Sequence, residues 1–211
     1  MKTRIRNYCA DIPARLKKLI HTNYGTHRGF VRLVLAQLEY ILGNVDDFCR
    51  FDPTQAKQLV FVCWGNINRS CFADYVARRL GIPASSFGLS TTTGSPAFPT
   101  AIATASRHGI RLDEHTATDK CDYHYQEGDW LFVMEIRHAR QLVALGFPSN
   151  RISLLGHWAS PMRLHIHDPH SLSRDYYITC FTLLESAVTN IASLLQANAG
   201  AVAEDPESLA S

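Results

Sequence analysis

From residue 58 onward the sequence predicts an α/β fold built around a parallel sheet. Two patterns predict it: short apolar runs alternate with segments of helical spacing, and the loops between them are short. The chain has 211 residues, of which 46% are hydrophobic, so it can bury one substantial core. A formal net charge of +2 is ordinary for a globular protein and gives no reason to expect nucleic-acid binding.

Residues 1–57 are predicted to form a basic helical extension. Residues 1–50 hold nine Lys or Arg against four Asp or Glu. Helices are expected near 13–21 and 26–42, and Gly43 ends the second. We interpret the two helices as a hairpin packed on the following domain. Docking of a partner protein, dimerisation and contact with anionic lipid are the alternatives.

The next domain is predicted to span residues 58–197 and to alternate strands with helices. Strands are expected near 59–63, 86–92, 129–134 and 151–155, and helices near 69–80, 98–108, 135–145 and 174–197. The tail, residues 198–211, has little to bury and is expected to be disordered. No apolar run reaches the length of a membrane span and no signal peptide is recognisable, so a reducing cytoplasm is the expected location.

The most informative segment joins the first predicted strand to the helix that follows it. It is a Cys-x5-Arg loop closed by a serine and consists of Cys63, Trp64, Gly65, Asn66, Ile67, Asn68, Arg69 and Ser70. A strand-to-helix loop can turn its backbone N–H groups inward, and together with the helix N-terminus it suits a tetrahedral oxyanion. Arg69 adds a planar fork that can hold two phosphate oxygens at once.

Cys63 is the candidate nucleophile of this loop. A cysteine attacks as its thiolate, which helix N-termini and nearby cations favour, and the Ser70 hydroxyl is placed to donate to the sulfur. In-line attack on phosphorus would give a phosphocysteine that water then hydrolyses. The purely structural alternative is a buried cysteine at the end of a core strand, with Arg69 exposed on the first helical turn.

A leaving alkoxide or phenoxide needs a proton, and Asp168 is the candidate general acid. Pro169 biases Asp168 toward an extended backbone, from which its side chain could hang over a pocket. An ordinary Asp-Pro turn is the alternative. The histidines of this region include a His-x-His pattern, which is too short to identify a metal site, so no metal is expected. No cofactor is expected either. The histidines are His157, His165, His167 and His170.

Residues 62–70 resemble the signature of the low-molecular-weight protein tyrosine phosphatases. Further matches follow in the family's order: Ser90 with Gly94, residues 107–110, residues 131–135, and Asp168 with Pro169. The resemblance covers roughly residues 58–197. It implies a three-layer α/β/α fold with a four-stranded parallel sheet.

The resemblance also implies roles for individual residues. Cys63 would be the nucleophile, Arg69 the phosphate clamp and Asp168 the general acid, while residues 64–70 would bind the phosphate. The residues that would shape the loop through hydrogen bonds are Asn66, Ser70, Ser90 and His108. The departures from the family pattern include Asn68 in place of a second cysteine, Cys71 in place of a proline, and a shorter segment Gly94–Pro99 that lacks the usual aromatic just after the glycine. Phe98 and Trp64 are the candidates to flank the substrate ring in its place.

The implied activity is hydrolysis of phosphotyrosine or another aryl phosphate monoester. Bacterial members of the family commonly act on tyrosine kinases of exopolysaccharide synthesis, so such a kinase is the expected partner. Two alternatives remain: a non-catalytic phosphate-binding module and a thiol-dependent arsenate reductase. The reductase needs resolving cysteines downstream, where the sequence has Met134 in the third strand and an isolated Cys121.

Overall fold

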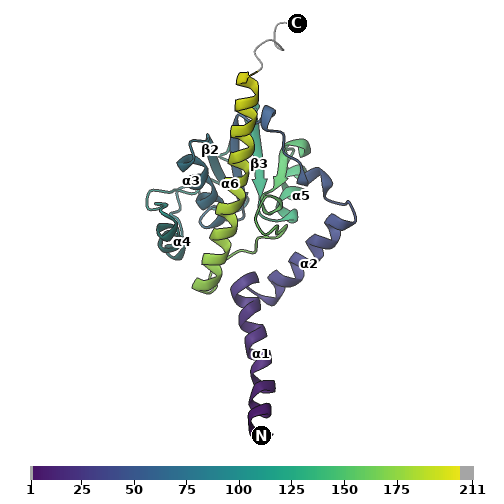
Figure 1. Ribbon diagram of the computed structural model, residues 1–211. Coiled ribbons are helices and arrows are strands. Elements are labelled where there is room, and N and C mark those ends of the chain that lie inside the picture. The colour runs from purple at the N-terminus through teal and green to yellow at the C-terminus, as the bar shows by residue number, and fades with distance from the viewer. Residues whose placement is uncertain (1, 205–211) are drawn as a thin grey trace.

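Four parallel strands form the sheet at the centre of the molecule, which is known here from a computed structural model (Figure 1). The structure describes the backbone of residues 2–204 and the side chains of residues 13–200. The order across the sheet is β2 (Ala84–Gly88), β1 (Gln58–Cys63), β3 (Asp129–Val133) and β4 (Ile152–Leu154). The central position of β1 places its carboxyl end, where Cys63 lies, between two neighbouring strands.

Strand β1 is buried on both faces, which explains its continuous run of apolar residues. Leu59, Phe61 and Cys63 join one hydrophobic cluster, whereas Val60 and Val62 join the cluster on the opposite face. Side chains alternate along a strand, so helices must cover both faces of the sheet. The predicted α/β/α layering is therefore confirmed.

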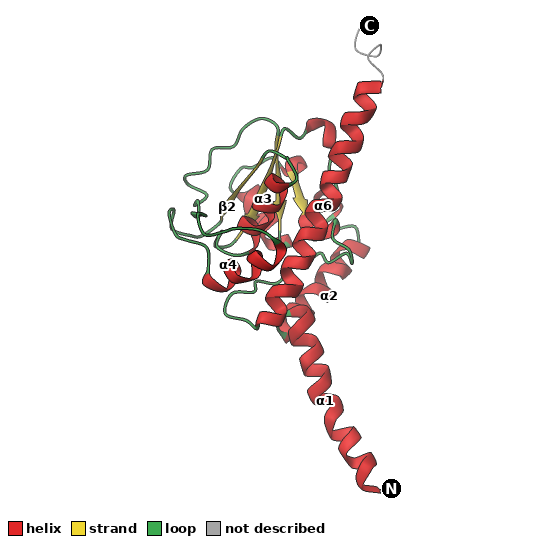
Figure 2. Ribbon diagram, turned by 60° about the vertical axis from the view of Figure 1, so that its left-hand side comes forward, coloured by secondary structure: helices red, strands yellow, loops and turns green. Residues whose placement is uncertain are grey.

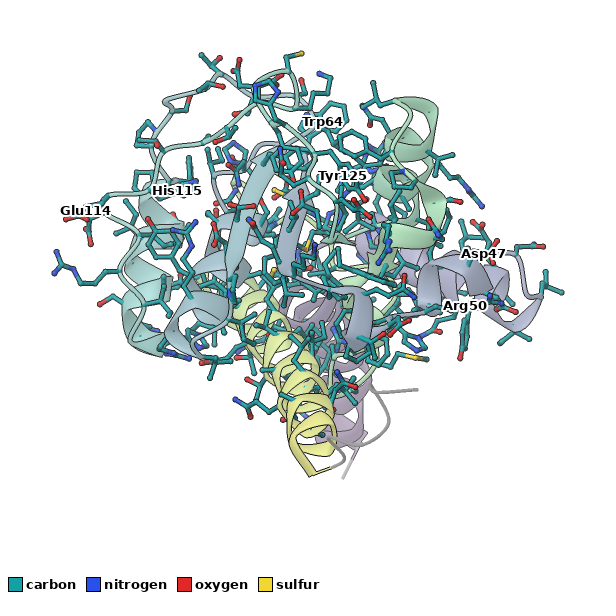
Figure 3. All side chains as sticks on the ribbon, turned by 90° about the horizontal axis from the view of Figure 1, so that it is seen from above. Asp47, Arg50, Trp64, Glu114, His115 and Tyr125 are labelled. Atoms are coloured by element: carbon teal, nitrogen blue, oxygen red, sulfur yellow. The ribbon has the colours of Figure 1, made fainter. Side chains whose placement is uncertain are left out.

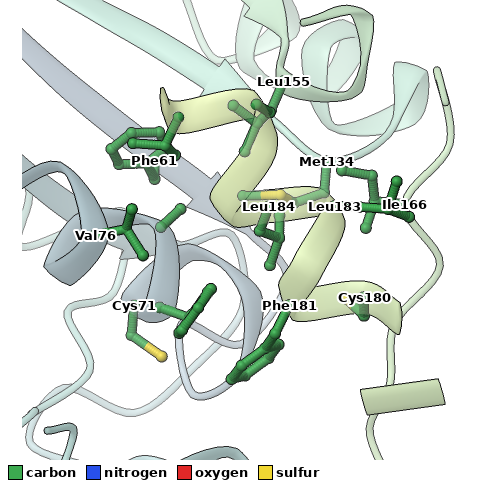
Figure 4. Packing of buried hydrophobic residues seen from close by; sticks show 14 of the residues in the cluster. Phe61, Cys71, Val76, Met134, Leu155, Ile166, Cys180, Phe181, Leu183 and Leu184 are labelled. Atoms are coloured by element: carbon green, nitrogen blue, oxygen red, sulfur yellow. The ribbon is translucent and has the colours of Figure 1, made fainter. Parts of the chain in front are cut away.

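Each face of the sheet has its own helices. One face carries α3 (Arg69–Arg79), α4 (Pro99–Ala105) and α6 (Arg174–Glu204), and the other carries α5 (Ile136–Ala144) and α2 (His27–Ile41). Short 3₁₀ turns complete the chain: Asp46–Cys49, Pro53–Gln55, Ser106–His108, Ser149–Arg151 and Leu155–His157. In the core, Phe72 of α3 stacks on Phe181 of α6 with ring centroids 4.1 Å apart (cluster in Figure 4).

The second strand differs from its predicted range of 86–92, because the chain leaves the sheet after Gly88. The backbone N–H of Leu89 donates to the carbonyl of Cys63 at 3.0 Å, and that of Ser90 donates to the carbonyl of Trp64 at 2.9 Å. These residues therefore support the loop after β1 instead of extending β2.

Helix α6 is longer than predicted and continues through residues 198–204 of the expected tail. Residues 205–211 lie outside the described residues. Within the described chain, α6 is the one helix with the length and composition to cross a membrane, over Arg174–Gly200, which corrects the expectation that no run is that long. Its apolar residues pack on the core, as Phe181 and Leu184 show, so this packing explains the composition (Figure 4).

The extension consists of two helices, as predicted, but the first is longer. Helix α1 spans Lys2–Tyr24 with Pro13 inside it, so the prediction that this helix begins at Pro13 is wrong. Helix α1 projects away from the body of the molecule, and α2 continues from its inner end along the side of the body (Figures 1 and 2). Thr26 caps α2, because its side chain accepts a hydrogen bond from the backbone N–H of Gly29 at 2.9 Å.

Helix α2 packs on the domain through one narrow face. Its buried residues are Gly29 and Ala36, and Glu39 pairs with Arg140 of α5. Packing of α2 on the following domain is as predicted, but α1 projects away from it and the two helices are not antiparallel, so the predicted hairpin is wrong (Figure 1). The opposite face of the helix remains apolar and exposed and includes Val31, Val34, Leu35, Leu38 and Ile41.

Candidate active site

Cys63 ends strand β1 at the bottom of a loop that leads directly into α3. The residue is 2% exposed, and its Sγ lies 3.0 Å from the hydroxyl oxygen of Ser70. The backbone N–H of Asn66 donates to the same sulfur at 3.2 Å. Two polar groups therefore face the sulfur and can stabilise a negative charge on it. The contact with Ser70 is the one expected from the sequence.

Asn66 holds the shape of the loop. Its φ of 51° lies in the left-handed region, which asparagine tolerates better than most residues. The side-chain amide donates to Ser70 Oγ at 2.8 Å and to Ser86 Oγ at 2.9 Å, and its oxygen accepts from the backbone N–H of Thr118 at 2.9 Å. Ser86 in turn donates to Asp74 Oδ2 at 3.0 Å. This buried network fixes the loop without any ligand.

Two of the residues expected to support the loop do not do so through their side chains. His108 pairs with Glu185 at 2.7 Å, on the surface of α6. His115 takes the expected place, since its Nε2 lies 2.7 Å from the carbonyl oxygen of Asn66. Ser90 contributes its backbone N–H, as described above. Both corrections have one reason: between β2 and β3 the chain has only α4 and one 3₁₀ turn and is otherwise irregular, so spacing does not show which of its polar residues returns to the site.

Arg69 is fully buried, which overturns the alternative that it is merely exposed on the first turn of α3. Its Nη1 donates to Glu135 Oε1 and to the carbonyl oxygen of Ile166, both at 2.9 Å. Its Nη2 lies 2.8 Å from Asp168 Oδ2, but Nη2 and Nε both lack a partner in hydrogen-bond geometry. The guanidinium is thus anchored on one side, and its remaining donors are free for an anion.

Arg69 and the carboxylates next to it stabilise one another's charges. Burial alone would lower the pKa of Arg69, but Asp168 and Glu135 outweigh burial and raise this pKa. Burial likewise opposes the charge of Glu135, but the nearby cations, Arg69 first, hold the pKa of this carboxyl well below its usual range. Glu135 lies in residues 131–135, one of the segments that resemble the family. No pattern in the sequence, however, predicted that its carboxylate would accept a hydrogen bond from Arg69.

Asp168 reaches the site from the loop before α6, where its side chain is 34% exposed. Its Oδ1 accepts a hydrogen bond from the backbone N–H of His170 at 3.2 Å. Cys63, Trp64 and Asp168 line one pocket of about 240 Å³, together with Gly65, Ile67 and Asn68 of the loop, Ser90 and Thr91 after β2, and His170. Arg69 lies behind this pocket, with its Nη2 2.8 Å from Asp168 Oδ2, so the structure brings Cys63, Arg69 and Asp168 together.

Trp64 and Phe98, the two candidates to flank the substrate ring, differ in their distance from the pocket. Trp64 lines the pocket and is 42% exposed (labelled in Figure 3), with the guanidinium of Arg137 5.8 Å from its ring centroid. Phe98 is half-buried and contacts the ring of His170, 4.6 Å between centroids. His170 therefore lies between Phe98 and the pocket, and Trp64 is the better placed to flank an aryl group.

The other thiols have different surroundings. Cys71 is buried and donates from Sγ to the carbonyl oxygen of Asn68 at 3.1 Å, and burial raises the pKa of its thiol. Cys121 is exposed. Among the described residues, no group of three His, Cys, Asp or Glu side chains could hold a metal ion.

Comparison with known proteins places these features in a family. Residues 58–201 match the family model described as low molecular weight phosphotyrosine protein phosphatase. The phosphatase Wzb of Salmonella typhi is 33% identical over 148 residues, which cover 68% of this chain and 97% of the relative. The crystal structure of AmsI from Erwinia amylovora has a TM-score of 0.61 and 27% identity, covering 69% of this chain and 97% of AmsI. Wzb from Escherichia coli K30, solved in complex with sulphate, has a TM-score of 0.59 and 28% identity, covering 66% of this chain and 99% of Wzb. The family model matches most of the chain, and the Cys-x5-Arg loop lies between a strand and a helix of the same α/β/α fold. The protein therefore belongs to the low-molecular-weight protein tyrosine phosphatase family.

Proposed function

We propose that this enzyme hydrolyses phosphotyrosine, or another aryl phosphate monoester, through a phosphocysteine intermediate on Cys63. In this proposal Arg69 is the phosphate clamp and Asp168 the general acid, and residues 64–70 form the cradle for the phosphate. One observation supports it most: Cys63 and Asp168 line one pocket, and Asp168 Oδ2 lies 2.8 Å from Nη2 of Arg69, whose Nη2 and Nε have no hydrogen-bond partner. The catalytic domain then spans residues 58–197, and residues 1–57 form its extension.

Binding of the phosphate would change the partner of Arg69. Its Nε and Nη2 are the free donors, and Nη2 is already next to Asp168 Oδ2. A phosphate that takes both donors replaces Asp168 as the partner of Nη2. The Asp168 carboxyl is then released toward the leaving-group oxygen at the mouth of the pocket.

The reaction would proceed in two steps. The Cys63 sulfur forms a bond to phosphorus while the bond from phosphorus to the ester oxygen breaks, and that oxygen takes a proton from Asp168. Water then attacks phosphorus, gives a proton to the Asp168 carboxylate and displaces the sulfur as a thiolate. Ser70 and the backbone N–H of Asn66, at 3.0 and 3.2 Å from Sγ, stabilise this thiolate in both steps.

Trapping the intermediate tests the proposal directly. Rapid acid quench of the wild-type enzyme during turnover of p-nitrophenyl phosphate should give a phosphorylated peptide that contains Cys63. Quantitative binding of a phosphotyrosine peptide with no covalent phosphate and no release of phosphate would instead indicate the binding-module alternative. Arsenate-dependent oxidation of a thiol donor would support the reductase, for which Cys71 and Cys121 offer no exposed pair beside Cys63.

Asp168→Asn should slow the enzyme in a way that depends on the leaving group. Asparagine cannot donate a proton from an acid, so kcat/KM for phenyl phosphate should fall about 100-fold or more, within the usual range for general acid catalysis. p-Nitrophenolate leaves readily without protonation, so its ester should lose much less. Measuring kcat/KM for both esters checks this, and equal losses would contradict the acid role of Asp168.

The physiological substrate is a separate proposal. The expected partner is a tyrosine kinase of exopolysaccharide synthesis, supported by the similarity to Wzb and to the probable phosphatase AmsI of Erwinia amylovora. A reducing cytoplasm suits a thiolate nucleophile. Dephosphorylation of such a kinase by the purified full chain, compared with an unrelated phosphotyrosine protein, would test this choice.

A further inference from the structure

The turn between α1 and α2 lies directly on the loop that carries Asp168. We refer to residues 23–29 as the α1–α2 turn and to residues 163–172 as the acid loop. Contacts occur at the start, the middle and the end of the acid loop. They pair Asn23 with Arg163, Thr26 with His167, and Gly25 with Leu172 and with Tyr176 beyond it.

The fit between these two segments leaves no spare room. Gly25 has a φ of +76°, and a Cβ there would lie 2.8 Å from Leu172 Cδ1 and from Tyr176 Cε1. A Cβ on Gly29 would lie 2.1 Å from the carbonyl oxygen of Tyr24, within the turn itself, and 2.9 Å from Cγ of His167. Real Cβ atoms do not approach this closely, so both glycines allow the α1–α2 turn to contact the acid loop.

A chain of polar contacts runs from the N-terminus of α2 to the carboxylate that anchors Arg69. Thr26 Oγ1 lies 3.1 Å from His167 Nε2, and His167 Nδ1 lies 3.4 Å from His165 Nε2. His165 Nδ1 is 3.6 Å from Glu135 Oε2. Burial lowers the pKa of both histidines, that of His165 to about 4, so both rings are neutral at neutral pH.

Assigning a donor and an acceptor to each of these contacts leaves one consistent direction for the hydrogen bonds from Thr26 to Glu135. Glu135 is an ionised carboxylate, so the nitrogen that faces it, His165 Nδ1, carries the proton. His165 Nε2 is then an acceptor, and His167 Nδ1 must donate to it. His167 Nε2 is left as an acceptor for the hydroxyl proton of Thr26, whose oxygen accepts from Gly29. The opposite direction would aim a lone pair of His165 at the Glu135 carboxylate.

His167 is therefore fixed on three sides immediately before Asp168. Its two ring nitrogens are engaged, and its carbonyl oxygen accepts from the hydroxyl of Tyr176 at 3.0 Å. Asp168 itself has one backbone hydrogen bond and the contact with Arg69. Because a bound phosphate would take the place of that contact, the orientation of the free carboxyl depends on the residues that flank it.

We propose that the α1–α2 turn positions the general acid, with Thr26 acting through His167 to hold Asp168 over the pocket. The inference rests on the proposed function, in which Asp168 protonates the leaving group. The family match begins at residue 58, so this positioning element belongs to the extension and is additional to the matched domain. Thr26 and His167 are positioning residues that do not touch the substrate.

Three variants of the full chain test the proposal: Thr26→Ala, Thr26→Ser and His167→Phe. Thr26→Ala removes the hydroxyl, whereas Thr26→Ser retains it, and His167→Phe keeps a ring of similar size and leaves the cap of α2 intact. For phenyl phosphate, Thr26→Ala and His167→Phe should each lower kcat/KM about tenfold, as expected for a misplaced catalytic group. For p-nitrophenyl phosphate the loss should stay within about twofold, and inhibition by inorganic phosphate should not change. Thr26→Ser should behave like the wild type with both esters.

The controls separate positioning from stability. Asp52 caps the 3₁₀ turn Pro53–Gln55, so Asp52→Ala removes a cap without contacting the acid loop. Its kcat/KM should remain unchanged for both esters. Equal losses with the two esters in Thr26→Ala and His167→Phe, or no loss in either, would overturn the positioning role. An inactive wild-type enzyme would instead refute the proposed function itself.

Discussion

Replacing Cys63 with serine is expected to abolish turnover of every phosphate ester while leaving binding of the substrate intact. A serine hydroxyl stays protonated in this site, so it cannot replace the thiolate as nucleophile. The loop should keep its shape because the network around Asn66 holds it through Ser70, Ser86 and Thr118. We expect kcat for p-nitrophenyl phosphate to fall at least 10⁴-fold, a factor that corresponds to about 5.5 kcal/mol in the activation free energy.

The measurement for Cys63→Ser combines steady-state kinetics with a binding assay. Isothermal titration with a phosphotyrosine peptide should give a dissociation constant within a few-fold of the KM of the wild type. Cys121→Ser is the matched control, since it changes an exposed cysteine and should leave kcat unchanged. Residual turnover above about 1% of the wild-type rate would mean that Cys63 is not the nucleophile.

Arg69→Lys is expected to produce the second largest loss. Lysine keeps a positive charge for Glu135 but replaces the planar guanidinium, which has five donors, with a single ammonium group. The fork that would hold two phosphate oxygens is lost, and so is the simultaneous contact with Ile166 O. Because such contacts strengthen as charge develops in the transition state, kcat/KM should fall about 10³-fold.

Inhibition constants show whether the lost function is anion binding. The Ki of inorganic phosphate should rise by at least tenfold in Arg69→Lys, because Nε and Nη2 are the free donors of the wild-type site. Arg140→Lys is the control, since this arginine pairs with Glu39 at the surface. Unchanged phosphate inhibition in Arg69→Lys would refute its role as the clamp, provided that the melting temperature shows a folded protein.

Much of the site was predictable from the sequence because its chemistry is local. The loop from Cys63 to Ser70 is a continuous segment between an apolar strand and an amphipathic helix, so the positions of its nucleophile and arginine follow from chain order. Asp168 was found through chemical necessity, since the leaving group needs an acid, together with the family resemblance. The burial of β1 on both faces was likewise predictable from its unbroken apolar run.

The residues that support the site were harder to identify. His115 instead of His108 contacts the loop, because His108 ends the 3₁₀ turn after α4 and faces α6, whereas His115 lies on the irregular chain that follows. Glu135 and Ile166 anchor Arg69 from the ends of other segments, at sequence separations of 66 and 97 residues. Hydrogen bonds between such distant residues depend on how strands and helices pack, and no local pattern encodes them.

The extension shows the same division between sequence and tertiary structure. Helical spacing predicted two helices, but α1 extends well beyond the predicted start at Pro13 and projects away from the domain instead of forming a packed hairpin with α2. That Thr26 would meet His167 could be decided only by the fold, which brings together two residues 141 positions apart. By itself the sequence determined the elements and the reacting groups, because periodicity and loop chemistry depend on neighbours along the chain. The tertiary structure decided which carboxylate, histidine and turn hold those groups in place, because that depends on contacts formed when the layers pack.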